Sequence, residues 1–201
     1  MNRMMTGVLV FATIVAPLVA SALKPNDKAP DFSAKASLAG KETDFSLKSA
    51  LKKGPVVVYF YPSAFTGGCN IEAHTFAENK EKFDAAGASI IGVSRDSLAR
   101  LNAFSADPQY CAGKIAVASD PNGTIATSYG LTTTNVKPGT KDSRGVEIDH
   151  DFTERTTFVV APDGKIAATL SSADDKISPA EHVQKSLAAV QQLGGSKSAK
   201  D

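Results

Sequence analysis

The chain has 201 residues, of which 42% are hydrophobic and 21% are charged. This is the composition of an ordinary globular protein that can build one sizeable core. Basic and acidic residues nearly balance, 22 against 21, for a net charge of +1. The sequence therefore offers no support for a nucleic acid or an anionic membrane surface as a partner.

The first 22 residues are expected to form a signal peptide. Arg3 precedes an apolar stretch over residues 7–20, and Ala20 and Ala22 are small residues at the two positions that a signal peptidase reads. The stretch is shorter than the roughly 20 residues needed to span a bilayer, although an uncleaved anchor is the alternative. Cleavage near Ala22 would give a periplasmic or secreted protein with no stable membrane span, in a compartment that permits disulfides.

The next residues predict the first half of an α/β domain, which we expect over residues 23–193. Residues 23–35 form a polar lead-in, and residues 38–47 are expected to make a hairpin that turns at Gly40. The continuous β-branched and aromatic run over residues 56–61 is typical of a strand buried on both faces. A helix over 69–83, a second buried strand over 89–94 and a helix over 97–104, capped by Asp96 or Ser97, follow.

The second half continues this alternation. We expect a short strand over 115–118, a short helix over 122–129, and a long loop or inserted hairpin over 131–151. Strands over 156–160 and 165–171 flank the turn at Pro162 to Gly164, and a last helix runs to about Leu193. Residues 194–201 are expected to be a disordered polar tail. The order predicts a thioredoxin-like α/β sandwich, in which helices flank a central mixed sheet.

Cys69 stands where a reactive thiol would be expected. It follows a buried strand, a proline and a glycine-rich loop, and it opens a helix, where free N–H groups and the helix dipole stabilise an anion. The thiolate is the nucleophilic form of cysteine. Thr66 offers a hydroxyl nearby. Arg155, at the start of a predicted strand, is the best candidate to stabilise charge on a departing oxygen.

These residues resemble a known family. The pattern Pro62-x-x-x-Thr66-x-x-Cys69 after a Val-rich strand resembles the active-site motif of the peroxiredoxins, the AhpC/TSA superfamily, and Arg155 matches the second active-site element of that family. Glu72, three residues after Cys69, is similar to a feature of the bacterioferritin-comigratory, or Q-type, branch. The resemblance extends over about residues 23–193.

The resemblance implies a thiol-dependent peroxidase with a thioredoxin fold. Cys69 would reduce hydrogen peroxide or organic hydroperoxides and become a sulfenic acid, without metal, haem or flavin as cofactor. Pro62, Thr66 and Arg155 would form its pocket, with Tyr61 and Glu72 as secondary pocket residues. The partners implied are a peroxide and a thioredoxin-like or small-thiol reductant, and the protein would be a monomer or a dimer.

The second half of the catalytic cycle is less determined. Many Q-type members carry a resolving cysteine five residues after the first, and this chain has His74 there. Cys111 is the other cysteine, and a disulfide would require its Cα atom to come within about 7 Å of that of Cys69, for example by unwinding around Pro108. We expect Cys111 to resolve the sulfenic acid. The alternative is a one-Cys cycle that an external thiol completes.

Other interpretations carry less weight. The two cysteines could form a static disulfide, or the scaffold could serve a non-catalytic redox-sensing or binding protein. Two cysteines and three scattered histidines do not predict a zinc site. His74 and His150 are expected to face solvent, Arg95 to make a surface ion pair, and His182 to have no role in the site.

Overall fold

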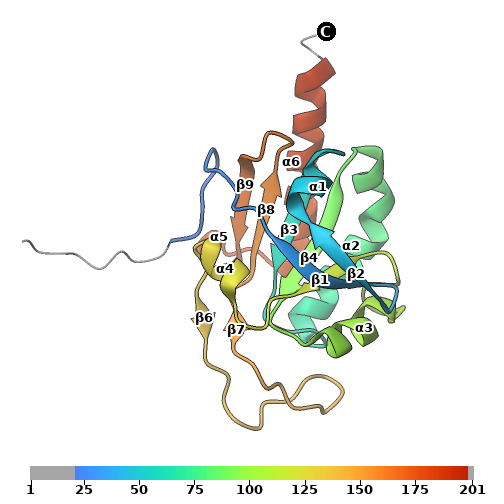
Figure 1. Ribbon diagram of the computed structural model, residues 1–201, viewed down its shortest axis with the longest axis vertical. Helices are drawn as coiled ribbons and strands as arrows, with labels where there is room; N and C mark the ends of the chain where they lie inside the picture. Colours follow the sequence, from blue (N-terminus) through green and yellow to red (C-terminus); the bar gives the residue numbers. More distant parts are fainter. Residues whose placement is uncertain (1–20, 199–201) are drawn as a thin grey trace, which may run out of the picture.

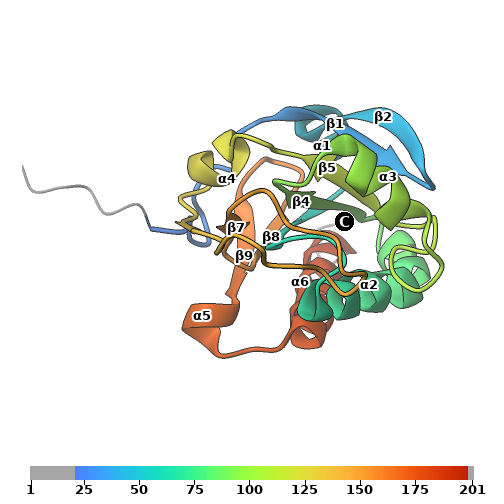
Figure 2. The same ribbon diagram turned by 90° about the horizontal axis from the view of Figure 1, so that it is seen from below.

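The computed structural model describes residues 21–198, so all but the last two residues of the expected signal peptide lie outside the described residues. A seven-stranded mixed sheet runs through the molecule, with helices on both faces (Figures 1 and 2). The strands lie in the order β2-β1-β5-β4-β3-β8-β9. The elements in chain order are β1 (Ser33–Leu38), β2 (Lys41–Ser46), α1 (Leu47–Leu51), β3 (Val56–Phe60), α2 (Gly67–Ala85), β4 (Ser89–Ser94), α3 (Leu98–Ala106), β5 (Ala116–Ser119), α4 (Thr124–Ser128), β6 (Thr133–Thr134), β7 (Phe152–Thr153), β8 (Thr156–Val160), β9 (Ile166–Ser171), α5 (Ser172–Asp175) and α6 (Pro179–Ser198).

The central strand β3 separates two hydrophobic cores. Val57 and Tyr59 point into the core that α2, α3 and α6 cover, whereas Val56, Val58 and Phe60 point into the opposite core, beside α1 and α4. Every residue of β3 is buried, which explains why its sequence is apolar without alternation. Each such side chain stabilises the fold by about 1.5–3 kcal/mol when fully buried.

The connections of β3 bring the start of α2 to one end of the sheet. β3 pairs with β4 in parallel and with β8 antiparallel, in the register that places Phe60 opposite Thr156. The end of β3 therefore lies beside the start of β8. The residue before β8 is Arg155, and the loop after β3 leads into α2. Figure 2 shows α2 and α6 together on one side of the sheet, with α4 on the other.

Most of the expected strands and helices are confirmed. The strands at 56–61, 89–94, 115–118, 156–160 and 165–171 and the helices at 69–83, 97–104 and 122–129 are found with small shifts at their ends. The first hairpin begins earlier than expected, at Ser33, and turns through Ala39 and Gly40. The short helices α1 and α5 are not predicted by the sequence pattern, because five and four residues are too few to show a period.

The end of the chain differs from the expectation of a disordered tail after Leu193. α6 continues through Gly194 to Ser198, so the first five tail residues are helical, and residues 199–201 lie outside the described residues. Glycine costs only about 1 kcal/mol in a helix, which does not by itself end one. Within residues 21–198 no helix is long and apolar enough to cross a membrane.

The segment 131–151 is a long loop closed at its base by a small hairpin. β6 and β7 pair antiparallel, with Thr133 opposite Thr153, and one further bridge joins Lys141 to Glu147. Figure 1 shows the loop extending beyond the end of the sheet, below β6 and β7. The two alternatives of the sequence, a loop and an inserted hairpin, are therefore both partly right.

Candidate active site

Cys69 lies in the first turn of α2. The helix begins at Gly67, and Thr66 is its N-cap residue, with no side-chain hydrogen bond to the first turn. The first amides of the helix therefore donate no hydrogen bond to the Thr66 side chain, and Cys69 lies in the turn where these amides and the positive end of the helix dipole favour an anion. Cys69 is only 2% exposed. A thiolate at this place is shielded from bulk water.

Arg155 completes the polar surroundings of the sulfur. Its Nη2 lies 3.1 Å from Sγ of Cys69, and its Nη1 donates to Oε2 of Glu72. The three side chains come from the start of β8 and the first two turns of α2, and they are nearly or fully buried. Burial alone would lower the pKa of Arg155, but the neighbouring Glu72 and Cys69 raise it. Arg155 is therefore a permanent cation against the sulfur.

Glu72 is the least hydrated member of this group. It is fully buried, and its second oxygen, Oε1, has no hydrogen-bond partner. Burial raises the pKa of Glu72 to about 7, although Arg155 opposes the shift. His182 Nδ1 lies 4.0 Å from Glu72 Oε1. The carboxyl group can thus gain or lose a proton near neutral pH without leaving the site.

His182 is a neutral member of the same surroundings, contrary to the expectation that it has no role there. Burial and the charge of Arg155 lower the pKa of His182 to about 4. Its hydrogen bonds agree: Ser172 donates its hydroxyl to a carbonyl and so accepts from Nε2 at 2.9 Å, while Thr157 lies 2.9 Å from Nδ1. A neutral imidazole satisfies both contacts.

The loop between β3 and α2 supplies Pro62 and Thr66. Pro62 and Thr66 are half-buried, and Thr66 donates its hydroxyl hydrogen to the carbonyl of Ser63 at 2.8 Å. That leaves the lone pairs of the Thr66 oxygen free to accept a hydrogen bond. Phe65 has a positive φ of 62°, which is strained for a residue with a side chain. The loop is therefore held in a shape that its sequence alone would not favour.

Comparison with known proteins matches this geometry to a family. The AhpC/TSA family model matches residues 25–169, a span that includes both Cys69 and Arg155. A putative peroxiredoxin of Mycobacterium tuberculosis is 33% identical over 144 residues, 72% of this chain and 82% of the relative. The chain belongs to the AhpC/TSA family of peroxiredoxins.

Solved structures agree with the fold and the branch of this peroxiredoxin. Peroxidoxin BcpB from Mycobacterium tuberculosis superimposes with a TM-score of 0.69 at 30% identity, covering 85% of this chain and 97% of its own. A cysteine-to-serine mutant of peroxiredoxin Q from Xanthomonas campestris gives a TM-score of 0.62 at 28% identity, covering 87% and 98%. The thioredoxin-like fold and the bacterioferritin-comigratory or Q branch are confirmed, and the protein is a thiol-dependent peroxidase.

The second cysteine of this peroxiredoxin lies in the hydrophobic core. Cys111 is free, as Cys69 is, and it is fully buried in the turns that follow α3. Burial raises the pKa of the Cys111 thiol well above its ordinary value, and Asp107 adds to the shift. The alternative of a static disulfide does not describe this structure, in which both cysteines are free. Cys111 is a protonated core thiol as long as its segment stays folded.

The remaining candidates fall into two groups. Tyr61 is fully buried and stacks on Tyr59 with ring centroids 5.4 Å apart, so it lies in the core and not on an open pocket wall. Burial raises the pKa values of both tyrosines well above 10.0. His74 is solvent-facing, as expected, and lies 3.3 Å from Glu78. Arg95 pairs with Asp151 at 3.6 Å.

Sequence reasoning missed a second buried polar cluster behind the active-site loop. The expectation that His150 is solvated is wrong, because only 8% of its side chain is exposed and Nε2 lies 2.9 Å from Asp96. Of the two expected caps of α3, Ser97 is the one found, and Asp96 is fully buried instead. Arg100 contacts both Asp96 and Asp142 at 2.8 Å. Two adjacent acidic residues around His150 were the signal available in the sequence.

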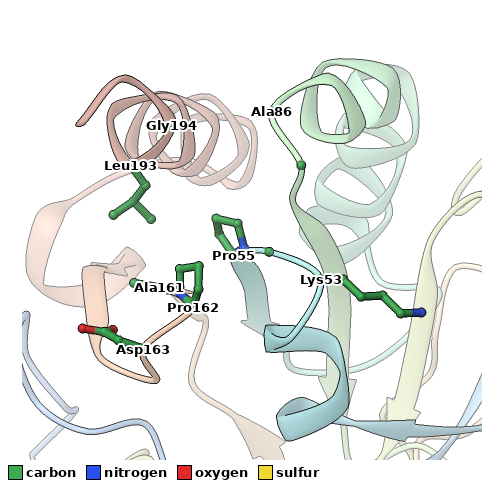
Figure 3. Close-up of a pocket in the computed structure, with 10 residues that line it drawn as sticks. Lys53, Pro55, Ala86, Ala161, Pro162, Asp163, Leu193 and Gly194 are labelled. Atoms are coloured by element: carbon green, nitrogen blue, oxygen red, sulfur yellow. The ribbon is translucent and has the colours of Figure 1, made fainter. Parts of the chain in front are cut away.

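Other features of the peroxiredoxin lie away from Cys69. A mostly apolar cavity of about 430 Å³ lies at the opposite end of the sheet, between the start of β3 and the end of α6 (Figure 3). Figure 3 shows Pro55, Pro162 and Leu193 around it. None of the expected site residues lines it. Among residues 21–198, no three His, Cys, Asp or Glu side chains gather in a way that could hold a metal ion.

Proposed function

We propose that Cys69 is the peroxide-reducing nucleophile of this thiol peroxidase. The observation that carries the proposal is the 3.1 Å contact between Arg155 Nη2 and Cys69 Sγ at the start of α2. The thiolate attacks the terminal oxygen of the peroxide, the O–O bond breaks, and the sulfur becomes a sulfenic acid. The remaining oxygen leaves as water or an alcohol after it takes a proton.

Arg155 and Thr66 divide the work around the oxygens. The guanidinium of Arg155 stabilises the charge that moves onto the leaving oxygen. The Thr66 oxygen accepts a hydrogen bond from the O–H of the bound peroxide, because its own hydrogen is engaged by Ser63. We assign Pro62 to the same pocket, because it is half-buried and lies on the loop that leads from β3 into α2. The similar bacterioferritin comigratory protein of Xanthomonas campestris has alkyl peroxide reduction activity, and we propose alkyl hydroperoxides beside hydrogen peroxide as substrates here.

The matched test replaces each cysteine in turn. We expect Cys69→Ser to abolish peroxide consumption, because no other thiol lies in the site. Cys111→Ser should form the sulfenic acid at the wild-type rate, since Cys111 is outside the first step. Arg155→Met should slow peroxide reduction by about 10²–10³-fold, the usual effect of losing one charge-stabilising donor. Stopped-flow measurement of peroxide reduction gives all three rates, and activity in Cys69→Ser would exclude the assignment.

We also propose that Cys111 resolves the sulfenic acid. Its sulfur would attack Sγ of Cys69 and release water, leaving a Cys69–Cys111 disulfide for a dithiol reductant of the thioredoxin type to reduce. Because Cys111 is buried and protonated, residues 107–114 must first leave the core. Ala112 has a positive φ of 52°, which is strained for a residue with a side chain. The alternative remains a one-Cys cycle with an external thiol.

Intact mass after one equivalent of peroxide separates these two cycles. We expect a loss of two hydrogens in the wild type, which indicates the disulfide, and a stable sulfenic acid or an adduct with added thiol in Cys111→Ser. A wild-type sulfenic acid that persists would favour the one-Cys cycle. The same spectrum, recorded on protein from an exporting host, tests the proposed export, because cleavage after Ala22 gives a chain that starts at Leu23.

A further inference from the structure

The loop over residues 131–151, which we call the strap, is attached to the loop that carries Thr66. The backbone N–H of Ser143 donates to the carbonyl of Phe65 at 2.9 Å. The guanidinium of Arg144 lies 3.2 Å from the centroid of the Phe65 ring. Phe65 is the residue with the strained positive φ, directly before Thr66. The strap therefore touches the active-site loop at its least relaxed point.

Asp96 holds the same loop from the protein interior. Its carboxylate accepts the backbone N–H of Ala64 at 2.7 Å and the hydroxyl of Ser63 at 2.9 Å. Arg100 donates to the carbonyl of Ala64 at 2.9 Å. Both polar backbone groups of Ala64 are thus fixed by one buried ion pair, two residues before Thr66. Hydrogen bonds donated to a carboxylate favour its ionised form, so these donors keep Asp96 deprotonated.

His150, on the strap, completes the hold on Asp96. Its Nε2 lies 2.9 Å from Oδ1 of Asp96, and its Nδ1 lies 3.0 Å from the carbonyl oxygen of Asp151. Both partners only accept hydrogen bonds, so both ring nitrogens must carry hydrogen for the two bonds to form. His150 makes both bonds only as the imidazolium cation.

We propose that His150 is a positioning residue for the peroxide reaction: its imidazolium holds Asp96, and Asp96 fixes the loop that sets Thr66 and Cys69 against Arg155. The proposal rests on the proposed role of Cys69. It assigns a purpose to the strap, which otherwise adds a long polar loop without contributing to the sheet. It also predicts that the geometry of the site depends on the protonation of a residue that touches neither peroxide nor sulfur.

The charges around His150 support the cationic form. Burial alone would lower the pKa of His150, but the hydrogen bonds to Asp96 and the carbonyl of Asp151 raise it above 6.5, and the charge of Asp149 adds to the effect. Reciprocally, burial would raise the pKa of Asp96, but His150 and the Ala64 amide lower it. The charged groups on the surrounding elements are Asp96, Arg95, Arg100, Lys137, Asp142, Arg144, Glu147, Asp149 and Asp151.

The direction of the pH effect follows from these contacts. Because the folded protein raises the pKa of His150, the hold on Asp96 is complete below the ordinary pKa of histidine. It is lost as pH rises through the raised value. Neutral His150 must give up one of its two hydrogen bonds. The active-site loop should then be less well fixed, and peroxide should react more slowly than the state of Cys69 alone would dictate.

His150→Gln tests the proposal, since glutamine has no titrating cation. The measured quantity is the second-order rate of Cys69 oxidation by hydrogen peroxide across pH, for wild type, His150→Gln and the surface control His74→Gln. The ratio of the wild-type rate to the variant rate cancels any pH dependence that both proteins share. We expect a ratio of about five for His150→Gln at low pH, as for the loss of a charged hydrogen bond, falling towards one as His150 titrates.

The control variant should give a ratio near one at every pH. A ratio near one for His150→Gln at all pH values, with Cys69→Ser inactive, would overturn the positioning role and leave the proposed function intact. Activity in Cys69→Ser would instead remove the proposed function. All rates are taken well below each thermal midpoint, so that lower stability alone does not change them.

A second measurement needs no variant to fold. In the wild-type protein, the amide NMR signal of Ala64 should titrate with the same midpoint as the ring signals of His150, because Asp96 joins the two groups. An Ala64 signal that stays fixed while His150 titrates would contradict the proposal. Concerted titration, together with the pH-dependent rate ratio, would establish it.

Discussion

Glu72 is a carboxyl group that the fold buries next to Arg155, the residue whose guanidinium contacts Cys69 Sγ. Arg155 is its one strong partner, and its other oxygen is without a hydrogen bond. An unpaired buried acceptor costs about 1–3 kcal/mol. The arrangement keeps a titrating carboxyl group beside Arg155, and burying that group lowers the stability of the fold by an amount that depends on pH.

Glu72→Gln should therefore change stability in a pH-dependent way. Burial raises the folded-state pKa of Glu72 to about 7, above its ordinary 4.5, so the folded protein retains a proton that the unfolded chain has lost between these values. Wild-type stability from this group is present at low pH and is lost as pH rises towards 7. We expect the variant to gain roughly 1–3 kcal/mol relative to the wild type between pH 5 and pH 8.

Urea unfolding at several pH values measures this difference. His182 titrates in the opposite sense, because its folded-state pKa of about 4 lies below its ordinary value. Its contribution is common to both proteins and is largely removed by taking the difference. A stability difference that stays constant with pH would show that Glu72 is not titrating in this range.

At the scale of elements, the site depends on how closely the start of α2 approaches β8 and α6. A Cβ atom at Gly68 would lie 3.1 Å from Nη2 of Arg155 and 3.3 Å from Cγ of Pro179. The glycine therefore lets three elements meet at the sulfur. The neighbouring Gly67 has no atom within 4 Å of the same constructed position.

This difference gives a matched pair of variants. Gly68→Ala should push Arg155 away from Cys69 by a few tenths of an ångström and slow peroxide reduction by about tenfold, since small displacements of a catalytic group are costly. Gly67→Ala should react at close to the wild-type rate. Stopped-flow rates decide the matter, and equal rates for the two variants would show that Arg155 adapts without loss.

The sequence predicted the helices and strands that show a hydrophobic pattern, and the site residues that belong to the Pro62-x-x-x-Thr66-x-x-Cys69 motif. β3 could be predicted because five consecutive apolar residues are typical of a strand buried on both faces. Cys69 could be predicted because it follows such a strand and opens a helix. The register of β3 and β8 brings Arg155 beside the sulfur. The sequence predicted Arg155 from its chemistry and its place at the start of a strand, and the family pattern pointed to the same residue. The contact between His150 and Asp96 was missed because it joins residues 54 positions apart, and the two aspartates beside His150 do not by themselves show that the histidine is buried.

At the scale of the whole molecule, the domain combines an aromatic core on one face of the sheet with a polar, charged region at one end of the sheet. One face of the sheet packs α2, α3 and α6 around an aromatic core, and one end of the sheet carries the strap and the loop between β3 and α2. The aromatic core leaves the hydroxyl groups of Tyr59 and Tyr61 without hydrogen-bond partners. The polar end instead contains cross-linked ion pairs, among them Arg100 with Asp96 and Asp142, and Arg155 with Glu72. The residues proposed to carry the chemistry thus lie at one end of the sheet.

The lead-in before β1 limits the pairing of one copy of the protein with another. β9 lies at an edge of the sheet, and the lead-in covers the start of that edge. The backbone N–H of Asn26 donates to the carbonyl of Ile166, the N–H of Ile166 donates to the carbonyl of Asp27, and the N–H of Ala29 donates to the carbonyl of Gly164. Thr169 also donates to the carbonyl of Leu23. Removal of the chain up to Ala22 would leave these hydrogen bonds between the lead-in and β9 intact. Removal of a few more residues would expose the backbone groups at the edge of β9, which can then pair with another copy of the chain. We therefore expect chains cut well beyond Ala22 to aggregate.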